Sequence, residues 1–203
     1  MHSGYPIVTH LDVCEETCNT CILDLDKMKK IGNWGLFHEI GHNMQRSEWT
    51  FDGCGEVTVN LFSMHAMEKI VGLPITKQEF VMDRKREFSK YFSKTPSYDD
   101  WKANCCMALM TFAQLIRHFG WEPMYRFMSE YENDMKNRKE CLPKSNQDKI
   151  DQWVTRYSNI IERNIKPQFQ LWDLPVSDSV DDHVSQFEAF KPSNETDPNV
   201  FFQ

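Results

Sequence analysis

Hydrophobic residues recur every three or four positions along most of the chain, and this spacing predicts α-helices rather than strands. One helix is predicted over residues 33–45 and a second over residues 56–71. A helical lobe is predicted over residues 76–172. Capping residues and helix breakers divide this lobe into predicted helices over residues 76–93, 97–119, 123–136 and 145–166.

The two ends of the chain depart from this helical pattern. Residues 4–13 combine Gly and Pro with β-branched residues, which predicts a short strand. After Pro175 the composition turns to Ser, Asp, Asn and Pro, so residues 176–203 are predicted to be a tail or the start of a further segment. The predicted domain therefore spans residues 1–175, and the predicted fold class is mainly α with a short β edge.

The bulk composition argues against two classes of partner. The 203 residues carry a formal net charge of -7 at pH 7, and their basic residues are interleaved with acids, so nucleic acid is not expected as a partner. No apolar run approaches the roughly 20 residues that a membrane-spanning helix needs, so no transmembrane segment is predicted.

The chain has seven cysteines, an odd number that favours unpaired thiols in a reducing compartment. Disulfides among some of them are an open alternative. A second candidate zinc site, of the structural kind, is formed by His10, Cys14, Cys18 and Cys21. Such sites usually draw their ligands from two separated segments, which weakens this interpretation.

The clearest chemical signal lies in residues 37–45, which read FHEIGHNMQ. Residues four positions apart share a helix face, so His38 and His42 offer two imidazole nitrogens to one metal ion. Glu39 lies about 100° around the helix from His38, close enough to touch a metal-bound water but badly placed to ligate. This arrangement is typical of a zinc hydrolase in which the glutamate is the general base.

A catalytic zinc needs a third protein ligand, and Glu56 is the best candidate because it opens the next predicted helix. Asn60 follows on the same helix face and is expected to accept the free ring N–H of a ligating histidine. His65 falls on a different face and is expected to be structural or exposed. The alternative to a zinc site is a polar helix face that binds no metal.

Three further groups of residues each have two interpretations. Gly4 and Tyr5 belong either to an edge strand that a substrate extends or to an ordinary edge strand. The aromatic residues near the site either stack on sugars or pack the zinc helix against its neighbours; they are Trp34, Phe37 and Trp49. Nothing in the sequence selects an oxyanion donor among Tyr91, Tyr98, Tyr125 and Tyr157.

Several stretches are similar to one known family. The run NWGLFHEIGHNMQ, then Trp49 and Phe51, then GEVTVNLFSMHAMEKIVGLP resemble the enhancin-type zinc metallopeptidases (peptidase family M60, a gluzincin family). HSGYPI near the start and FQLWDLP near residue 172 resemble the animal branch that includes the TRP-channel-associated factors. The resemblance covers residues 1–175.

The resemblance implies one zinc ion per chain, held by His38, His42 and Glu56, with Glu39 as the general base. It implies hydrolysis of peptide bonds in proteins or glycoproteins, since microbial and viral members cleave heavily glycosylated proteins such as mucins. It also implies a partial α+β gluzincin fold, because family members carry a sheet-bearing lobe before the zinc helix. The sequence is therefore expected to be a C-terminal fragment of a larger domain.

The animal branch adds a hypothesis from another functional class. Some vertebrate members have a degraded zinc signature and bind ion channels, whose gating and trafficking they control. The signature is intact in this chain, which favours an enzyme. The alternative is a non-catalytic regulator of a TRP-type channel, and a fragment without independent function is a third interpretation. The animal branch favours the cytoplasmic face of the plasma membrane as the location, and the microbial members favour an extracellular one.

Overall fold

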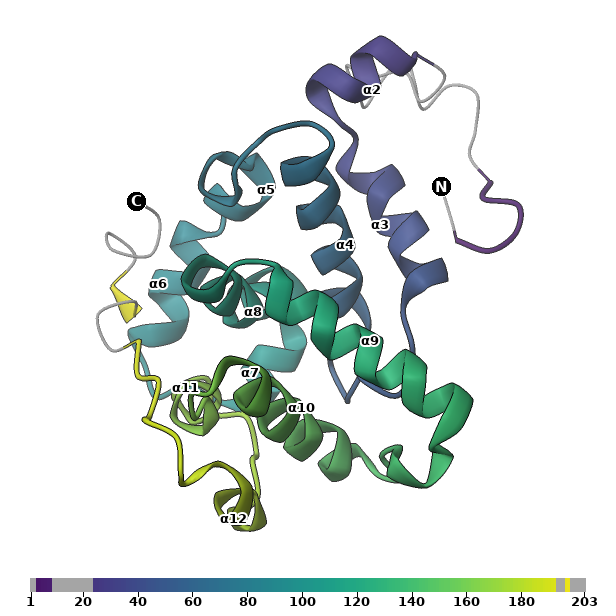
Figure 1. Cartoon of the computed structure of the whole chain (residues 1–203). Helices are drawn as coiled ribbons and strands as arrows, with labels where there is room; N and C mark the ends of the chain where they lie inside the picture. Colours follow the sequence, from purple (N-terminus) through teal and green to yellow (C-terminus); the bar gives the residue numbers. More distant parts are fainter. Residues whose placement is uncertain (1–2, 9–23, 193–195, 198–203) are drawn as a thin grey trace.

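The computed structural model describes residues 3–8, 24–192 and 196–197, and α-helices dominate this part of the chain (Figure 1). The prediction of a mainly α fold is confirmed. The longer helices are α2 (Leu25–Ile31), α3 (Trp34–Met44), α4 (Gly55–Lys69), α6 (Lys85–Phe92), α8 (Cys105–Phe119), α9 (Glu122–Asn137) and α10 (Asn146–Ile161). The shorter ones are α5 (Glu79–Met82), α7 (Tyr98–Ala103), α11 (Lys166–Leu171) and α12 (Asp181–Val184), with 3-10 turns η1 (Ile75–Lys77), η2 (Lys139–Cys141) and η3 (Asp178–Val180). Within the described residues, none of these helices has the length and apolarity to cross a membrane.

Helix α8 is the centre of the hydrophobic core. Its residues from Met107 to Ile116 are all buried, so the helix is covered on every side. Its two buried polar side chains have partners, because the Trp101 indole donates to Thr111 Oγ1 at 2.9 Å and the Trp172 indole donates to Gln114 Oε1 at 2.8 Å. Helices α4, α9 and α10 pack around this core, and Figure 1 shows α9 and α10 running together across the lower half of the view.

Helices α3 and α4 form an antiparallel pair at one edge of the molecule (Figure 1). Gly41 of α3 allows their close approach, since a Cβ atom there would lie 2.8 Å from both Cγ2 and the backbone oxygen of Val59. The loop between the two helices buries Trp49 and Phe51 in the core. It is also fastened to α10, because the Trp153 indole donates to the Trp49 carbonyl at 2.7 Å.

The structure differs from the sequence prediction over residues 76–93, where one helix is expected. The chain forms η1, α5 and α6 instead. The side chain of Gln78 is fully buried between η1 and α5, and its amide donates to the carbonyls of Met64 and Leu73 at 3.0 Å each. These partners come from α4 and the turn after it, so the break satisfies tertiary contacts that the local pattern does not reveal.

The helix predicted over residues 97–119 is also interrupted, at Asn104. This residue leaves the helical conformation (φ -136, ψ 86), and its side chain accepts the Met107 N–H to cap α8. A further helix, α11, begins at Lys166 beside Pro167, which the sequence analysis took as the end of the preceding helix. Proline in the first turn of a helix is well tolerated, because that N–H has no helical partner.

The two ends of the chain have contacts that the sequence did not predict. Residues 176–203 were expected to be a tail or the start of a further segment, and within them Val180 and Val184 are buried in the core and Ala189 pairs with Asn164 through an isolated β-bridge. Of the strand expected over residues 4–13, the described part contains a bend over residues 4–6, with Gly4 at φ 115, and a single β-bridge residue at Val8. Residues 9–13 lie outside the described part of the chain.

Candidate metal centre

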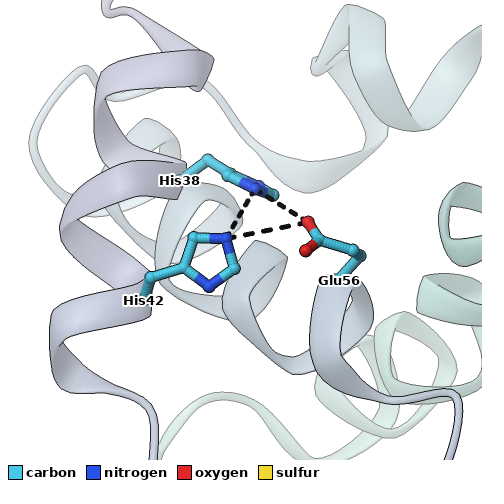
Figure 2. A group of neighbouring side chains, drawn as sticks. All are labelled: His38, His42 and Glu56. Carbon is cyan, nitrogen blue, oxygen red and sulfur yellow. Dashed lines mark hydrogen bonds and ion pairs between the residues drawn. The ribbon is translucent and has the colours of Figure 1, made fainter. Parts of the chain in front are cut away.

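Helix α3 carries both histidines of the HExxH segment. Its N-terminus is capped by Asn33, whose side chain accepts the Leu36 N–H at 2.9 Å. His38 and His42 lie one turn apart on the face toward α4, and both are partly buried. The opposite wall is the first turn of α4, where Glu56 projects toward the two rings (Figure 2).

The three side chains converge on one point, and together they are called here the His–His–Glu centre. His38 Nε2 and His42 Nε2 are 3.1 Å apart, and Glu56 Oε2 lies 3.1 Å from the first and 3.7 Å from the second. Two nitrogen or oxygen ligands of one tetrahedral zinc ion, each about 2.05 Å from it, are about 3.3 Å apart. The spacing and the donor types are therefore those of a group that could hold a metal ion.

Asn60 selects the tautomer of His38. Its Nδ2 donates to the Glu56 carbonyl at 2.7 Å, and its Oδ1 accepts the indole N–H of Trp34 at 2.9 Å. Because an indole nitrogen only donates, this pair of contacts sets the orientation of the carboxamide. His38 Nδ1, 2.8 Å from the same Oδ1, must then carry a proton, so the neutral ring presents a bare Nε2 to the centre.

The indole N–H of Trp34 contacts Asn60, and the sequence did not predict this contact. Trp34 stacks on Phe80 with ring centroids 4.2 Å apart, so the interpretation as a packing residue describes its ring and leaves out its N–H. Trp49 is buried in the core against Tyr131. The sequence contained a signal for this contact. Trp34 precedes His38 by one helical turn on α3, and Asn60 is an acceptor for the same histidine on α4.

Glu39 directly follows His38 on α3 and is partly exposed. Among the described residues, its carboxylate has no hydrogen-bond or ion-pair partner, in contrast to Glu56. A carboxylate without such a partner can accept a proton without first breaking another contact.

Gly4 lies against α3 through Asn43, the residue that follows His42. The Gly4 N–H donates to Asn43 Oδ1 at 2.9 Å, and Asn43 Nδ2 donates to the Gly4 carbonyl at 3.1 Å. The carboxamide therefore pairs with Gly4 as a neighbouring strand would. Tyr5 projects from this segment with 86% of its surface exposed.

The remaining candidates lie in other surroundings. His65 contacts Tyr125, with His65 Nε2 and the phenol oxygen 2.6 Å apart, and its ring packs edge-on against Trp121. The Tyr91 and Tyr98 hydroxyls donate to the carbonyls of Trp172 and Asp52, and Tyr157 is fully buried. The second candidate zinc site falls on residues outside the described part of the chain: His10, Cys14, Cys18 and Cys21.

Comparison with known proteins decides the family. The model of the family "Peptidase M60, enhancin and enhancin-like" matches residues 1–173. The chain belongs to the peptidase M60 family. The matched range contains the whole His–His–Glu centre, and the resemblance drawn from the sequence is confirmed.

The curated M60 relatives include animal proteins named for an ion channel. The chain is 33% identical over 195 residues to "TRPM8 channel-associated factor 1" of Homo sapiens, and 34% identical over 195 residues to "TRPM8 channel-associated factor 2" of the same organism. Each match covers 94% of this chain and 20% of the relative. The chain thus spans about a fifth of the length of these relatives.

Solved structures share the fold. A crystal structure of a functionally unknown conserved protein from Bacillus anthracis str. Ames matches with a TM-score of 0.68 and 26% identity, covering 83% of this chain and 34% of that one. A mutant of a functionally unknown conserved protein from the same source matches with a TM-score of 0.70 and 25% identity, over 87% of this chain and 35% of that one. The helical arrangement of this M60 chain therefore recurs as part of a larger bacterial protein.

Proposed function

We propose that the chain is the zinc-binding part of a metallopeptidase that hydrolyses peptide bonds of proteins or glycoproteins. The observation that carries this proposal is the convergence of His38 Nε2, His42 Nε2 and Glu56 Oε2 within 3.1 to 3.7 Å of one another. Three nitrogen and oxygen ligands are the protein set of a catalytic zinc site, which keeps a further position open. Membership of the M60 family supports the same chemistry.

The residues present fit one zinc ion per chain. The bare Nε2 of His38 suits a metal, and Asn60 holds the ring in that form. Glu56 is 60% exposed, so the centre lies at the surface, where a polypeptide substrate can reach it. A zinc ion held by these residues would supply Lewis-acid activation of water and of the peptide carbonyl.

Glu39 is proposed as the general base. It accepts a proton from the attacking water and delivers that proton to the leaving amine, so the same carboxylate serves both halves of the reaction. Its lack of a hydrogen-bond partner among the described residues supports this role. His38 and His42 hold the metal, and Asn60 orients His38.

We also propose that the segment around Gly4 and Tyr5 contacts the substrate. Asn43 fixes this segment directly beside the second histidine. Both backbone polar groups of Gly4 are paired with that carboxamide, so Gly4 has none left for a substrate. We therefore expect the exposed side chain of Tyr5 to make the contact. A Tyr5→Ala variant is expected to raise KM and leave zinc content unchanged.

The test is the metal content of the purified chain, measured by plasma mass spectrometry in wild type, His42→Ala and Glu39→Gln. We expect about one zinc per chain in wild type, loss in His42→Ala and retention in Glu39→Gln. A protease assay on glycoproteins should then show activity in wild type and none in Glu39→Gln. Folded wild type without zinc would contradict the peptidase proposal.

A second candidate is a non-catalytic regulator that binds a TRP-type ion channel and controls its gating and trafficking at the plasma membrane. The observation that favours it is the 33% identity to TRPM8 channel-associated factor 1 over 94% of this chain. On this proposal the chain acts at the cytoplasmic face of the plasma membrane, whereas an extracellular location suits a secreted peptidase.

Glu39→Gln separates the two candidates. A regulator co-purifies with the channel equally well in wild type and in Glu39→Gln, and it has no turnover in either form. A peptidase shows turnover in wild type, and Glu39→Gln abolishes this turnover even if the variant retains zinc. Zinc alone does not separate them, because a binding protein can retain the metal.

A further inference from the structure

A cavity lies at the start of helix α3, beside the His–His–Glu centre. Its volume is about 540 Å³, which is in the range of sites that bind small molecules and side chains. The start of α3 forms one wall, and the end of α4, η1 and α5 form the others. The residues with the largest apolar or backbone contribution to the lining are Ile31, Trp34, Gly35, Met67, Leu73 and Phe80.

Two residues of the lining set the position of the cavity relative to the proposed metal site. Trp34 lies four residues before His38 on α3, and residues four apart share one helix face. Gly35 likewise lies four residues before Glu39. The contacts agree, because the Trp34 indole and the His38 ring both meet Asn60 Oδ1. The cavity therefore begins about 6 Å along the helix from the proposed metal ligand and the proposed general base.

The reachable walls of the cavity are mainly apolar. The rings of Trp34 and Phe80 are stacked with centroids 4.2 Å apart, so they form one block of aromatic surface. Both residues are partly exposed, so this block is open to a ligand. Met67 and Leu73 add aliphatic surface from the end of α4 and the turn after it.

The polar residues of the lining offer little to a charged or strongly polar ligand. The carboxamides of Asn33 and Gln78 belong to residues that are 5% and 0% exposed, so they present almost no polar surface to the cavity. The Arg84 guanidinium is already held over an aromatic ring of the lining, 5.1 Å from its centroid. The other two charged residues, Lys77 and Asp83, have opposite signs. The site therefore favours an apolar ligand group over an ionic one.

We propose that this cavity binds a large apolar side chain of the peptide substrate, with an aromatic ring preferred. The inference rests on the proposed peptidase function and adds one subsite to it. An extended peptide advances about 3.3 Å per residue, so a side chain one or two residues from the scissile bond spans the distance from His38 to the cavity. The aromatic block of Trp34 and Phe80 is the surface on which that ring packs.

The first test reads the cavity without zinc and without turnover. The probes are the N-acetyl amides of phenylalanine, alanine and glutamate, each titrated to millimolar concentration into the whole chain prepared without metal. The reporter is the indole N–H resonance of Trp34, which Trp34→Phe assigns by removing it. The phenylalanine probe is expected to shift this resonance saturably, and the alanine and glutamate probes are expected to shift it about 10-fold less at equal concentration.

Two outcomes of this titration would overturn the proposal. A shift with the glutamate probe that equals the shift with the phenylalanine probe would overturn the apolar class of ligand. No shift with any of the three probes would overturn the site itself. Both outcomes are read on wild-type protein, so they do not depend on the folding of a variant.

Leu73→Trp and Ile70→Trp are a matched pair of variants for the same titration. Leu73 lines the cavity, whereas Ile70 is 62% exposed at the end of α4 and is not part of the lining. The larger ring in Leu73→Trp fills the cavity and is expected to abolish the shift, while Ile70→Trp is expected to respond as wild type. A full wild-type response in folded Leu73→Trp would overturn the proposal.

The second test is the selectivity of cleavage, and it separates this proposal from the proposed function. The peptides differ only in having Phe or Ala at one of the two positions on either side of the scissile bond. At one of these positions kcat/KM is expected to be about 10- to 100-fold higher with Phe, and Leu73→Trp is expected to lose this preference. Turnover without any such preference would overturn the subsite. A positive indole shift without turnover would instead contradict the peptidase function alone.

Discussion

His38 Nδ1 and Asn60 Oδ1 lie 2.8 Å apart, and this contact decides which nitrogen of the histidine faces the His–His–Glu centre. The same oxygen accepts the Trp34 indole N–H, so one carboxamide joins the start of α3 to the start of α4. Metal ligands are commonly oriented by such outer contacts, whose loss costs affinity even though they never touch the ion.

Replacing Asn60 is expected to weaken zinc binding without removing a ligand. Asn60→Leu keeps the approximate volume but leaves the ring of His38 free to turn, so zinc affinity should fall about 10- to 100-fold. Trp34→Phe keeps the stack on Phe80 and removes only one donor, so its effect should be smaller. Competition with a chromophoric zinc chelator measures both. Unchanged affinity in Asn60→Leu would show that the contact does not orient the ligand.

Gly41→Ala is expected to push α3 and α4 apart. The new Cβ would meet the Val59 backbone oxygen at 2.8 Å, and backbone cannot move aside as a flexible side chain can. The free energy of unfolding should fall by about 1 to 3 kcal/mol, and zinc affinity should fall with it. Gly55→Ala, where a Cβ meets no atom within 4 Å, is the control. Denaturant unfolding should show Gly55→Ala at wild-type stability or higher by less than about 1 kcal/mol.

The link between α9 and α10 is expected to contribute strongly to stability. Asp134 is 1% exposed and accepts from Arg156 at 2.8 Å and from Arg138 at 2.7 Å. Asp134→Ala leaves Arg156 partly buried without this carboxylate and should lower the free energy of unfolding by about 3 kcal/mol. Glu132→Ala removes a partly exposed pair with Arg46 and should lower it by less than about 1 kcal/mol. Similar losses in the two variants would contradict this account.

Stability is expected to fall in mildly acidic solution because of His65. Burial lowers the pKa of His65 below its ordinary value of 6.5, with nearby Lys69 acting in the same direction. The unfolded chain then binds the proton more readily, so the contribution of neutral His65 is present above pH 6.5 and is lost as pH falls through the folded-state pKa. His65→Gln should therefore lose less stability than wild type between about pH 7.5 and about pH 5 in denaturant titrations. Equal losses in the two proteins would assign the pH dependence to other groups.

The start of α3 shows which features of the site can be predicted from residues that are near one another in the sequence. The helix is predicted to begin at Asn33 and the structure places this residue as its N-cap, because capping depends on residues three positions apart. The spacing of His38 and His42 likewise follows from one helical turn. Glu56 and Asn60 are candidates from their place at the head of the next helix, and the structure brings both to His38.

Tertiary contacts account for the features that the local pattern does not predict. The break at Gln78 depends on carbonyls in α4 and the following turn, and the burial of Val180 depends on a core formed by distant helices. A proline is compatible with a position after one helix or in the first turn of the next, and the structure places Pro167 in the first turn of α11, whereas α10 already ends at Ile161. The pairing of Gly4 with Asn43 spans a sequence separation of 39 and has no local signal.

The loop that separates the two histidines from Glu56 is anchored by Trp153, a residue 104 positions beyond Trp49. The three proposed ligands are close in sequence, so bringing them together costs little loop-closure entropy. Their relative placement nevertheless depends on a contact that exists only when α10 is folded onto the core. An ion bound at the proposed site would therefore be thermodynamically linked to the distant helix, and its occupancy would report on the folding of the whole helical body.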